Sequence, residues 1–194
     1  MDTGAPSLPL VDAVVIGTSA GGVDALLTLL SALPGTFRPA VMVVIHLPPD
    51  VPSGIAGLVG QRCALPVDEA LDKQPVRGGT VVFAPPSYHL LVEPTGTLAL
   101  SVDDPVRFSR PAIDPLFESA SIAYGPRLLA LLLTGGSDDG SAGLAAVRTR
   151  GGAAWIQDPD TAVAATMPAA GLAFAGADAV LPIDAMARAL AALP

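Results

Sequence analysis

The chain contains one cysteine and few basic residues. Cys63 alone cannot form an internal disulfide or a paired-cysteine zinc site, so the composition suits a reducing compartment. Ten basic residues against eighteen acidic ones give a formal net charge of -8. A surface of that sign does not attract phosphates, so neither nucleic acid nor an anionic membrane is an expected partner.

Long apolar runs are also lacking, although 51% of the residues are hydrophobic. Glycine, proline or charge ends each run well short of the roughly 20 residues that span a bilayer. The first ten residues, MDTGAPSLPL, have neither a basic start nor a long apolar core, so they do not resemble a secretory signal. We therefore expect a cytoplasmic protein without membrane insertion. Residues 1–10 are expected to be a flexible tail, and residues 11–194 a single domain.

Short apolar runs alternate along the chain with segments of helical spacing. Runs typical of buried strands cover 13–17, 40–45, 80–84, 128–134, 153–157 and 179–181. Helical patterns cover 23–33, 114–124, 141–150, 167–174 and 183–193. Residues 89–93 and 97–101, joined by Pro-Thr-Gly, predict an antiparallel hairpin. This alternation predicts an α/β fold, a doubly wound three-layer sandwich with a mostly parallel sheet and an antiparallel hairpin.

Polar residues of complementary kinds follow three of the predicted strands. Ser19 follows the first strand, His46 the second, and Asp138 and Asp139 the strand over 128–134. Ligands of open α/β sheets bind outside the carboxyl ends of the strands, so these side chains are expected to meet. A serine becomes a good nucleophile when an imidazole takes its proton and a carboxylate orients that imidazole. The three strand ends therefore predict a nucleophile, a base and an orienting carboxylate.

Each of these residues also has a simpler interpretation when taken alone. Residues 17–21 read Gly-Thr-Ser-Ala-Gly, the G-x-S-x-G elbow, but such turns also cap helices or bind anions. His46 alone is more often structural than catalytic, and an aspartate before a helix is often a cap. His89, the other histidine, is the rival base, although its place beside the hairpin favours a structural or rim role. The conjunction at three strand ends favours the catalytic interpretation.

The order and spacing of the motifs exclude several other families. An α/β-hydrolase presents Ser, then Asp or Glu, then His, whereas this chain presents Ser19, His46 and Asp139. Residues 17–22 do not match the G-x-G-x-x-G dinucleotide fingerprint. No G-x-x-x-x-G-K-[ST] phosphate loop occurs, and Lys73 is the only lysine.

The pattern as a whole resembles the catalytic domain of the CheB family, the chemotaxis receptor protein-glutamate methylesterases. The similar segments follow one another over nearly the whole chain: VVIGTSAGGVDAL, VMVVIHLPPD, VVFAPPSYHLLV, RPAIDPLFESAS, LLTGGSDDGSAGL and QDPDTAVAATMPAAGLAFAGADAVLP. Six segments in order are far more specific than one elbow motif.

The resemblance implies a Ser-His-Asp triad, which falls on Ser19, His46 and Asp139. Asp139 is preferred to Asp138 because the family's aspartate directly precedes the glycine of an Asp-Gly pair. Backbone N–H groups near Gly136, together with Ala20, are the candidates for the oxyanion hole. The implied reaction is hydrolysis of glutamyl methyl esters on the cytoplasmic helices of chemoreceptors, with deamidation of glutamines in some members. No cofactor and no metal is expected.

Two features depart from the family pattern. Residues 134–137 read Thr-Gly-Gly-Ser where the family usually has Thr-Gly-Met-Gly, so glycine replaces a bulky wall residue at Gly136. Family members also commonly carry an N-terminal receiver domain, whereas about twelve residues precede the first strand here. We therefore expect no receiver domain, and a constitutive enzyme, one regulated in trans, or an isolated domain. A hydrolase for another ester or amide, and a catalytically weak partner-binding module, are the alternative functions.

Overall fold

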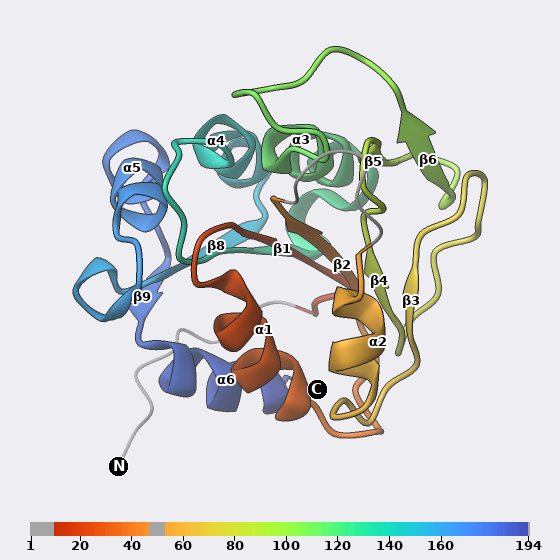
Figure 1. Ribbon diagram of the computed structural model, residues 1–194, viewed down its shortest axis with the longest axis horizontal. Helices are drawn as coiled ribbons and strands as arrows, with labels where there is room; N and C mark the ends of the chain where they lie inside the picture. Colours follow the sequence, from red (N-terminus) through yellow and green to blue (C-terminus); the bar gives the residue numbers. More distant parts are fainter. Residues whose placement is uncertain (1–9, 47–52, 194) are drawn as a thin grey trace.

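A seven-stranded, wholly parallel sheet forms the middle layer of the computed structural model, which describes residues 10–46 and 53–193 (Figure 1). Its strand order is β3-β4-β2-β1-β7-β8-β9. The strands are β1 (Ala13–Thr18), β2 (Ala40–Ile45), β3 (Val67–Glu69), β4 (Val81–Phe83), β7 (Leu128–Leu132), β8 (Ala153–Gln157) and β9 (Ala179–Leu181). A separate antiparallel hairpin pairs β5 (His89–Val92) with β6 (Leu98–Ser101).

Helices cover both faces of the sheet (Figure 1). One face carries α1 (Gly22–Ser31), α2 (Ile55–Gly60) and α6 (Ile183–Ala191). The other carries α3 (Ile113–Tyr124), α4 (Ser141–Thr149) and α5 (Thr166–Ala175), with the hairpin beside α3. Two short 3-10 turns, at Gly125–Arg127 and Pro159–Thr161, complete the elements.

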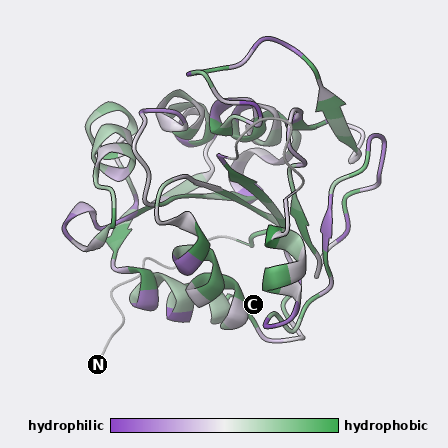
Figure 2. Cartoon of the chain, in the orientation of Figure 1, coloured by the Kyte–Doolittle hydropathy of each residue, from purple (hydrophilic) through white to green (hydrophobic). Residues whose placement is uncertain are grey.

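The central strands are apolar along their whole length because both of their faces are buried. In β1, Val14 and Ile16 belong to the core under α1 and α6, whereas Ala13 and Val15 belong to the core under α3 and α4. Figure 2 shows the strands as hydrophobic and polar residues on the outer side of α6. The resulting two cores hold the carboxyl ends of β1, β2 and β7 side by side.

The strand order reverses at β1, which places the candidate site. The chain passes from β1 to β2 on one side and returns to β7 on the other. Thr18 pairs with Ile45 in β2, and Gly17 pairs with Leu132 in β7, so these three strands end at nearly the same level. Ligands of doubly wound sheets bind at such a reversal.

The predicted fold class is confirmed by this topology, and the bounds of β2, β8 and β9 match the predicted ones. Two elements were missed, α2 and β3, and the strand predicted over 128–134 ends at Leu132 because the chain then turns into the loop before α4. The expected tail, residues 1–10, falls almost wholly outside the described residues. Within the described ranges, none of the helices combines the length and hydropathy that a membrane crossing requires.

Candidate active site

Ser19 lies immediately after β1, at the turn into α1. Its N–H donates to the carbonyl of Thr134, at 2.9 Å, and its own carbonyl accepts the N–H of Gly22, at 2.9 Å. Gly21 has a φ of 78°, a left-handed conformation that favours glycine, and a Cβ there would lie 2.6 Å from Val163. The glycines of the elbow are therefore required by the turn, which leaves Ser19 half-buried at the helix N-terminus.

Thr134 fixes this turn from the end of the neighbouring strand. Its backbone carbonyl accepts the Thr18 hydroxyl at 2.8 Å as well as the Ser19 N–H. Its hydroxyl donates to the carbonyl of Ala20 at 2.8 Å and accepts the N–H of Ala164 at 2.9 Å. Its own N–H donates to Gln157 Oε1 at 2.9 Å. Because Thr134 is buried and makes all of these bonds, it fixes the backbone around Ser19.

His46 follows β2 directly and lies next to Ser19 across the strand pair. Its N–H donates to the carbonyl of Thr18 at 3.1 Å, which continues the β1–β2 ladder to the strand end. Its side chain is 12% exposed, and Nε2 lies 2.7 Å from Asp139 Oδ2. An ionised carboxylate only accepts hydrogen bonds, so Nε2 carries the proton and Nδ1 is the nitrogen that can act as a base.

Asp139 is fully buried and accepts two further hydrogen bonds. The N–H groups of Ile113 and Asp114, in the first turn of α3, donate to its Oδ2 and Oδ1 at 2.7 and 3.0 Å. The helix N-terminus thus stabilises the negative charge that faces His46. Asp138 points elsewhere, because it pairs with Arg107 at 3.2 Å with both side chains about half exposed. The structure therefore brings His46 together with Asp139 and not with Asp138.

His89, the rival base, is used in the scaffold. Its Nδ1 accepts the N–H of Ala112 at 3.2 Å, and its Nε2 lies 3.1 Å from the carbonyl of Asp104. These contacts define the tautomer with the proton on Nε2 and tie the loop after β6 to the start of α3. His89 is 2% exposed, so its ring supports α3 and does not reach the Ser19 turn as a base.

The third predicted contact, between Ser19 Oγ and His46, is not among the hydrogen bonds of the described residues. The two residues lie at adjacent strand ends, but no bond joins their side chains. Such contacts are often long in the absence of substrate and shorten in the reacting complex. The hydrogen bonds of the described residues therefore fix the His46 ring on Asp139, and none of them joins Ser19 Oγ to that ring.

The two predicted oxyanion donors, Gly136 and Ala20, are both exposed. None of the backbone hydrogen bonds among the described residues uses their N–H groups. Gly135 is fixed on both sides, since its N–H donates to Ala164 and its carbonyl accepts from Met167. A Cβ on Gly136 would meet no atom within 4 Å, so the position tolerates a side chain and opens directly to solvent.

The sequence reasoning missed three residues that support this site. Thr134 and Gln157 organise the Ser19 turn, and Asp114 lies beside Asp139. Burial raises the pKa of Asp114 from its ordinary 3.8 to about 6, an effect opposed by the N–H of Gly143 and reinforced by the charge of Asp139. A buried polar residue at a strand end, such as Gln157 after Ile156, was the only available signal for these roles.

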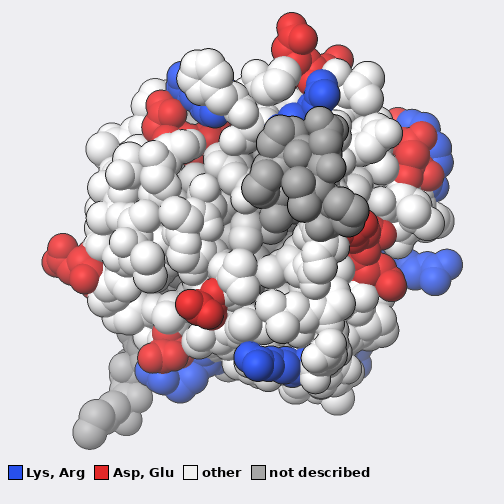
Figure 3. Space-filling model, in the orientation of Figure 1, with Lys and Arg blue, Asp and Glu red and all other residues white. Residues whose placement is uncertain are grey.

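A cavity of about 230 Å³ lies beside the loop that carries Asp139. Its lining combines the Arg107–Asp138 pair with apolar surface from α4 and α5, including Phe174. On the face drawn in Figure 3, acidic and basic side chains are interspersed and form no continuous basic patch. The surroundings of the site thus offer mixed polar and apolar contacts.

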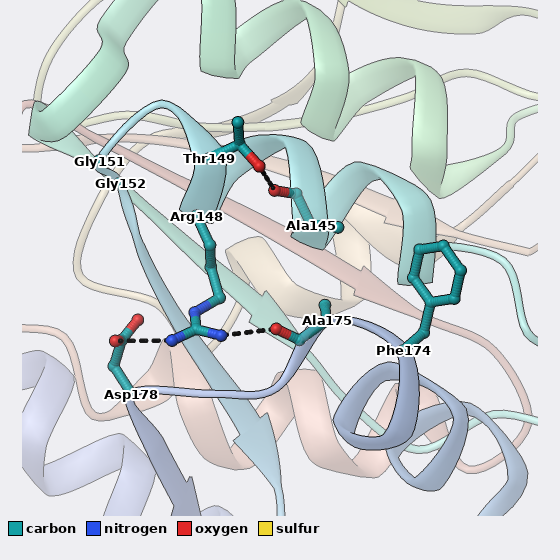
Figure 4. Close-up of a pocket in the computed structure, with 8 residues that line it drawn as sticks. All are labelled: Ala145, Arg148, Thr149, Gly151, Gly152, Phe174, Ala175 and Asp178. Atoms are coloured by element: carbon teal, nitrogen blue, oxygen red, sulfur yellow. Dashed lines mark hydrogen bonds and ion pairs between the residues drawn. The ribbon is translucent and has the colours of Figure 1, made fainter.

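A second cavity, of about 520 Å³, lies toward the other end of α4 (Figure 4). Arg148 in its wall donates to the carbonyl of Ala175 and lies 3.5 Å from Asp178. Asp178 in turn accepts the N–H of Ala154 at 2.8 Å. These contacts tie the end of α5 to β8, so we assign this arginine a structural role.

The known proteins that this chain resembles are methylesterases of one family. The family model described as CheB methylesterase matches residues 14–190. A putative protein-glutamate methylesterase/protein-glutamine glutaminase of Leptospira interrogans is 38% identical over 177 residues, which cover 91% of this chain and 92% of that protein. Protein-glutamate methylesterase/protein-glutamine glutaminase 1 of Rhodospirillum rubrum is 39% identical over 181 residues, 91% of this chain but 47% of that protein.

The fold is also found among solved structures. The crystal structure of the Thermotoga maritima CheB methylesterase catalytic domain superposes with a TM-score of 0.90 at 32% identity. The match covers 96% of this chain and all of that domain. The chain thus corresponds in length to a catalytic domain and to the Leptospira protein, and to about half of the Rhodospirillum protein.

Proposed function

The chain belongs to the CheB methylesterase family, and we propose that it hydrolyses glutamyl methyl esters on the cytoplasmic helices of chemoreceptors. We assign the nucleophile to Ser19, the base to His46 and the orienting carboxylate to Asp139. The observation that carries this assignment is the 2.7 Å contact between His46 and the buried Asp139, at a strand end next to Ser19. Residues 11–194 form the catalytic unit in this proposal.

The proposed reaction has two halves. Ser19 Oγ attacks the γ-carbonyl carbon of the ester while its proton passes to His46 Nδ1, and Asp139 stabilises the imidazolium that forms. The tetrahedral intermediate collapses by breaking the bond to the methoxy group, which leaves as methanol with the proton from His46. Water then attacks the acyl-serine by the same proton route, which releases the glutamate and restores Ser19.

The negative oxygen of each tetrahedral intermediate requires donors. We propose that the N–H groups of Ala20 and Gly136 supply them, since both are exposed and neither is used in a backbone hydrogen bond of the described residues. The N-terminus of α1 next to Ser19 adds a favourable partial charge. Losing one oxyanion donor typically costs about 3 to 4 kcal/mol of transition-state stabilisation.

Deamidation of glutamine is a second candidate activity. The relatives from Leptospira and Rhodospirillum are both named as glutaminases as well as methylesterases. Glutamine presents the same γ-carbonyl, and the same proton transfer from His46 would release ammonia in place of methanol. A partner that regulates the chain in trans is compatible with either activity.

The test is methanol release from a methylated receptor fragment, measured for the wild type, Ser19→Ala and His46→Ala. Loss of release in both variants is expected. Ser31→Ala is the matched control, because Ser31 lies in α1 and donates only to the Leu27 carbonyl at 2.6 Å. Full turnover by Ser19→Ala would contradict the proposal. If a purified wild type releases no methanol and Ser19 is not labelled by a fluorophosphonate, the partner-binding alternative is favoured.

A further inference from the structure

Two helix N-termini beside the site are joined by hydrogen bonds from backbone N–H groups to aspartate carboxylates. Asp139, two residues before α4 begins, accepts the N–H groups of Ile113 and Asp114 at the start of α3. In return, Asp114 Oδ1 accepts the N–H of Gly143, in the first turn of α4, at 2.7 Å. The N-terminus of α3 is therefore capped by Asp139, from the loop before α4, and the N-terminus of α4 is capped by Asp114 of α3. The residues directly before the two helices make no side-chain cap.

The close approach of the two helices makes this exchange possible. A Cβ on Gly143 would lie 2.6 Å from Phe117 Cβ and 3.1 Å from the backbone of Asp114. Only a glycine therefore lets the first turn of α4 come near enough for the Asp114 carboxylate to reach its N–H. Asp114 is 8% exposed, so water does not easily replace this bond.

We propose that Asp114 is a positioning residue of the active site, which fixes the start of α4 on the start of α3 and thereby holds Asp139 against His46. The expected change in kcat/KM rests on the proposed function, whereas the positioning of Asp139 rests on the hydrogen bonds between the starts of α3 and α4. Asp139 reaches His46 from a short loop between β7 and α4, and that loop has Thr134 as its fixed point on one side. Asp114 supplies the fixed point on the other side.

Charge is a second consequence of the same arrangement. Burial raises the pKa of Asp114 most, and the charges of Asp139 across the helix pair and Glu118 on the same helix raise it further. From the neighbouring elements, His89 of β5 binds Ala112 at the same helix end, and His46 binds Asp139 from the end of β2. These contacts place the Asp114–Gly143 bond in the same network as the His46–Asp139 pair.

The test compares Asp114→Asn with Asp114→Ala. Asparagine keeps an oxygen for the Gly143 N–H and removes the charge, so kcat/KM at pH 8 should stay within about threefold of wild type. Alanine removes the bond itself, and we expect kcat/KM to fall about 10- to 100-fold.

The matched control is Asp184, which also lies in the first turn of a helix, α6, but is exposed. Asp184→Asn and Asp184→Ala should leave both kcat/KM and the pH profile unchanged. A folded Asp114→Ala variant with wild-type kcat/KM would overturn the proposal, as would an Asp114→Asn variant that loses as much activity as Asp114→Ala. If the alanine variant does not fold, Asp114→Asn still decides, because a loss of more than about tenfold in kcat/KM despite the kept Gly143 bond would overturn the proposal.

A spectroscopic readout separates this inference from the proposed function. The ring N–H proton of His46 that bonds Asp139 gives a downfield ¹H resonance in labelled protein, whether or not an ester is cleaved. Asp114→Ala should broaden it or move it upfield, whereas Asp184→Ala should not. An unchanged His46 resonance in Asp114→Ala would refute the positioning role even in an active enzyme. A changed resonance in a protein without esterase activity would retain it and refute only the function.

Discussion

The two halves of the candidate site differ in how firmly they are held. On one side, Asp139 is fully buried and receives hydrogen bonds from His46 and from two N–H groups of α3. On the other side, Ala20 and Gly136 are exposed, and the space beside Gly136 is empty to 4 Å. We call these the carboxylate half and the oxyanion half.

This difference follows from what each half has to do. A buried carboxylate needs fixed donors whether or not substrate is present, because an unpaired charge is costly to bury. Oxyanion donors must instead stay available until an ester arrives. The comparison indicates that the carboxylate half is complete in the free protein, whereas substrate completes the oxyanion half.

The largest expected effect comes from the carboxylate half. Asp139→Asn should lower kcat/KM by about 10⁴-fold, because an amide favours the wrong His46 tautomer while keeping the shape of the site. Asp138→Asn, one residue away and half exposed in its pair with Arg107, should change it by less than about twofold. Methanol release assays on both variants check this. Similar losses in the two variants would remove the basis for choosing Asp139.

The next effect tests the scaffold shared by both halves. Thr134→Val removes the hydroxyl that binds Ala20 and Ala164, so the Ser19 turn should loosen and kcat/KM should fall about 10- to 100-fold. The free energy of unfolding should fall by about 1 to 3 kcal/mol, because the Ala20 carbonyl and the Ala164 N–H each lose a part-buried hydrogen bond. Denaturant titration and the ester assay measure the two quantities. Thr149→Val, which loses only a contact to the Ala145 carbonyl within α4, is the control and should be nearly neutral.

The stability of the carboxylate half should depend on pH through Asp114. Its folded pKa of about 6 lies above its ordinary 3.8, so between these values the folded protein holds a proton that the unfolded chain releases. From pH 8 to pH 5 the wild type should therefore gain stability relative to Asp114→Asn, on the order of 1 kcal/mol. Urea titrations of both proteins at the two pH values measure this difference. A difference that stays constant with pH would contradict the assigned burial of the charge.

The smallest effect is expected in the oxyanion half. Gly136→Met places a side chain in open space, so the free energy of unfolding should change by less than about 0.5 kcal/mol. We expect kcat/KM to change by no more than about threefold. The change should arise from KM, because the new side chain would contact the substrate and not the triad. Gly143→Ala is the contrasting variant, since its Cβ would press on Phe117, and it should destabilise the fold. Severe destabilisation by Gly136→Met would show that this half is more constrained than the structure indicates.

Much of the fold could be predicted because the central strands are buried on both faces. The runs over 40–45 and 153–157 carry that burial in the sequence itself, and their predicted bounds coincide with β2 and β8. In contrast, α2 has six residues and β3 has three, with β3 at the sheet edge and only partly buried. Two of the six residues of α2 are glycine, and β3 reads Val-Asp-Glu, so neither shows an apolar pattern. The equally short β9 reads Ala-Val-Leu and was predicted.

The site could be predicted in part for a related reason. Ser19, His46 and Asp139 each follow a strand whose end is visible in the sequence, so topology brings them to one edge. No neighbouring residue in the sequence distinguishes Asp139 from Asp138, so the choice depended on the resemblance to the family. In the structure, the two N–H groups of α3 that bind Asp139 make the distinction. Asp114 was missed because its partner, Gly143, lies 29 residues away and binds through the backbone. The residues around Asp114 indicate only that a helix begins there.

The proposed activity depends most on the activation of Ser19 by the His46–Asp139 pair. The most direct measurement is the rate at which a fluorophosphonate labels the protein, with the modified peptide identified by mass spectrometry, in wild type and Asp139→Asn. We predict labelling at Ser19 alone and a rate at least about 100-fold lower in Asp139→Asn, because the serine then lacks a correctly oriented base. Equal rates in the two proteins, or labelling at another serine, would contradict the proposed mechanism.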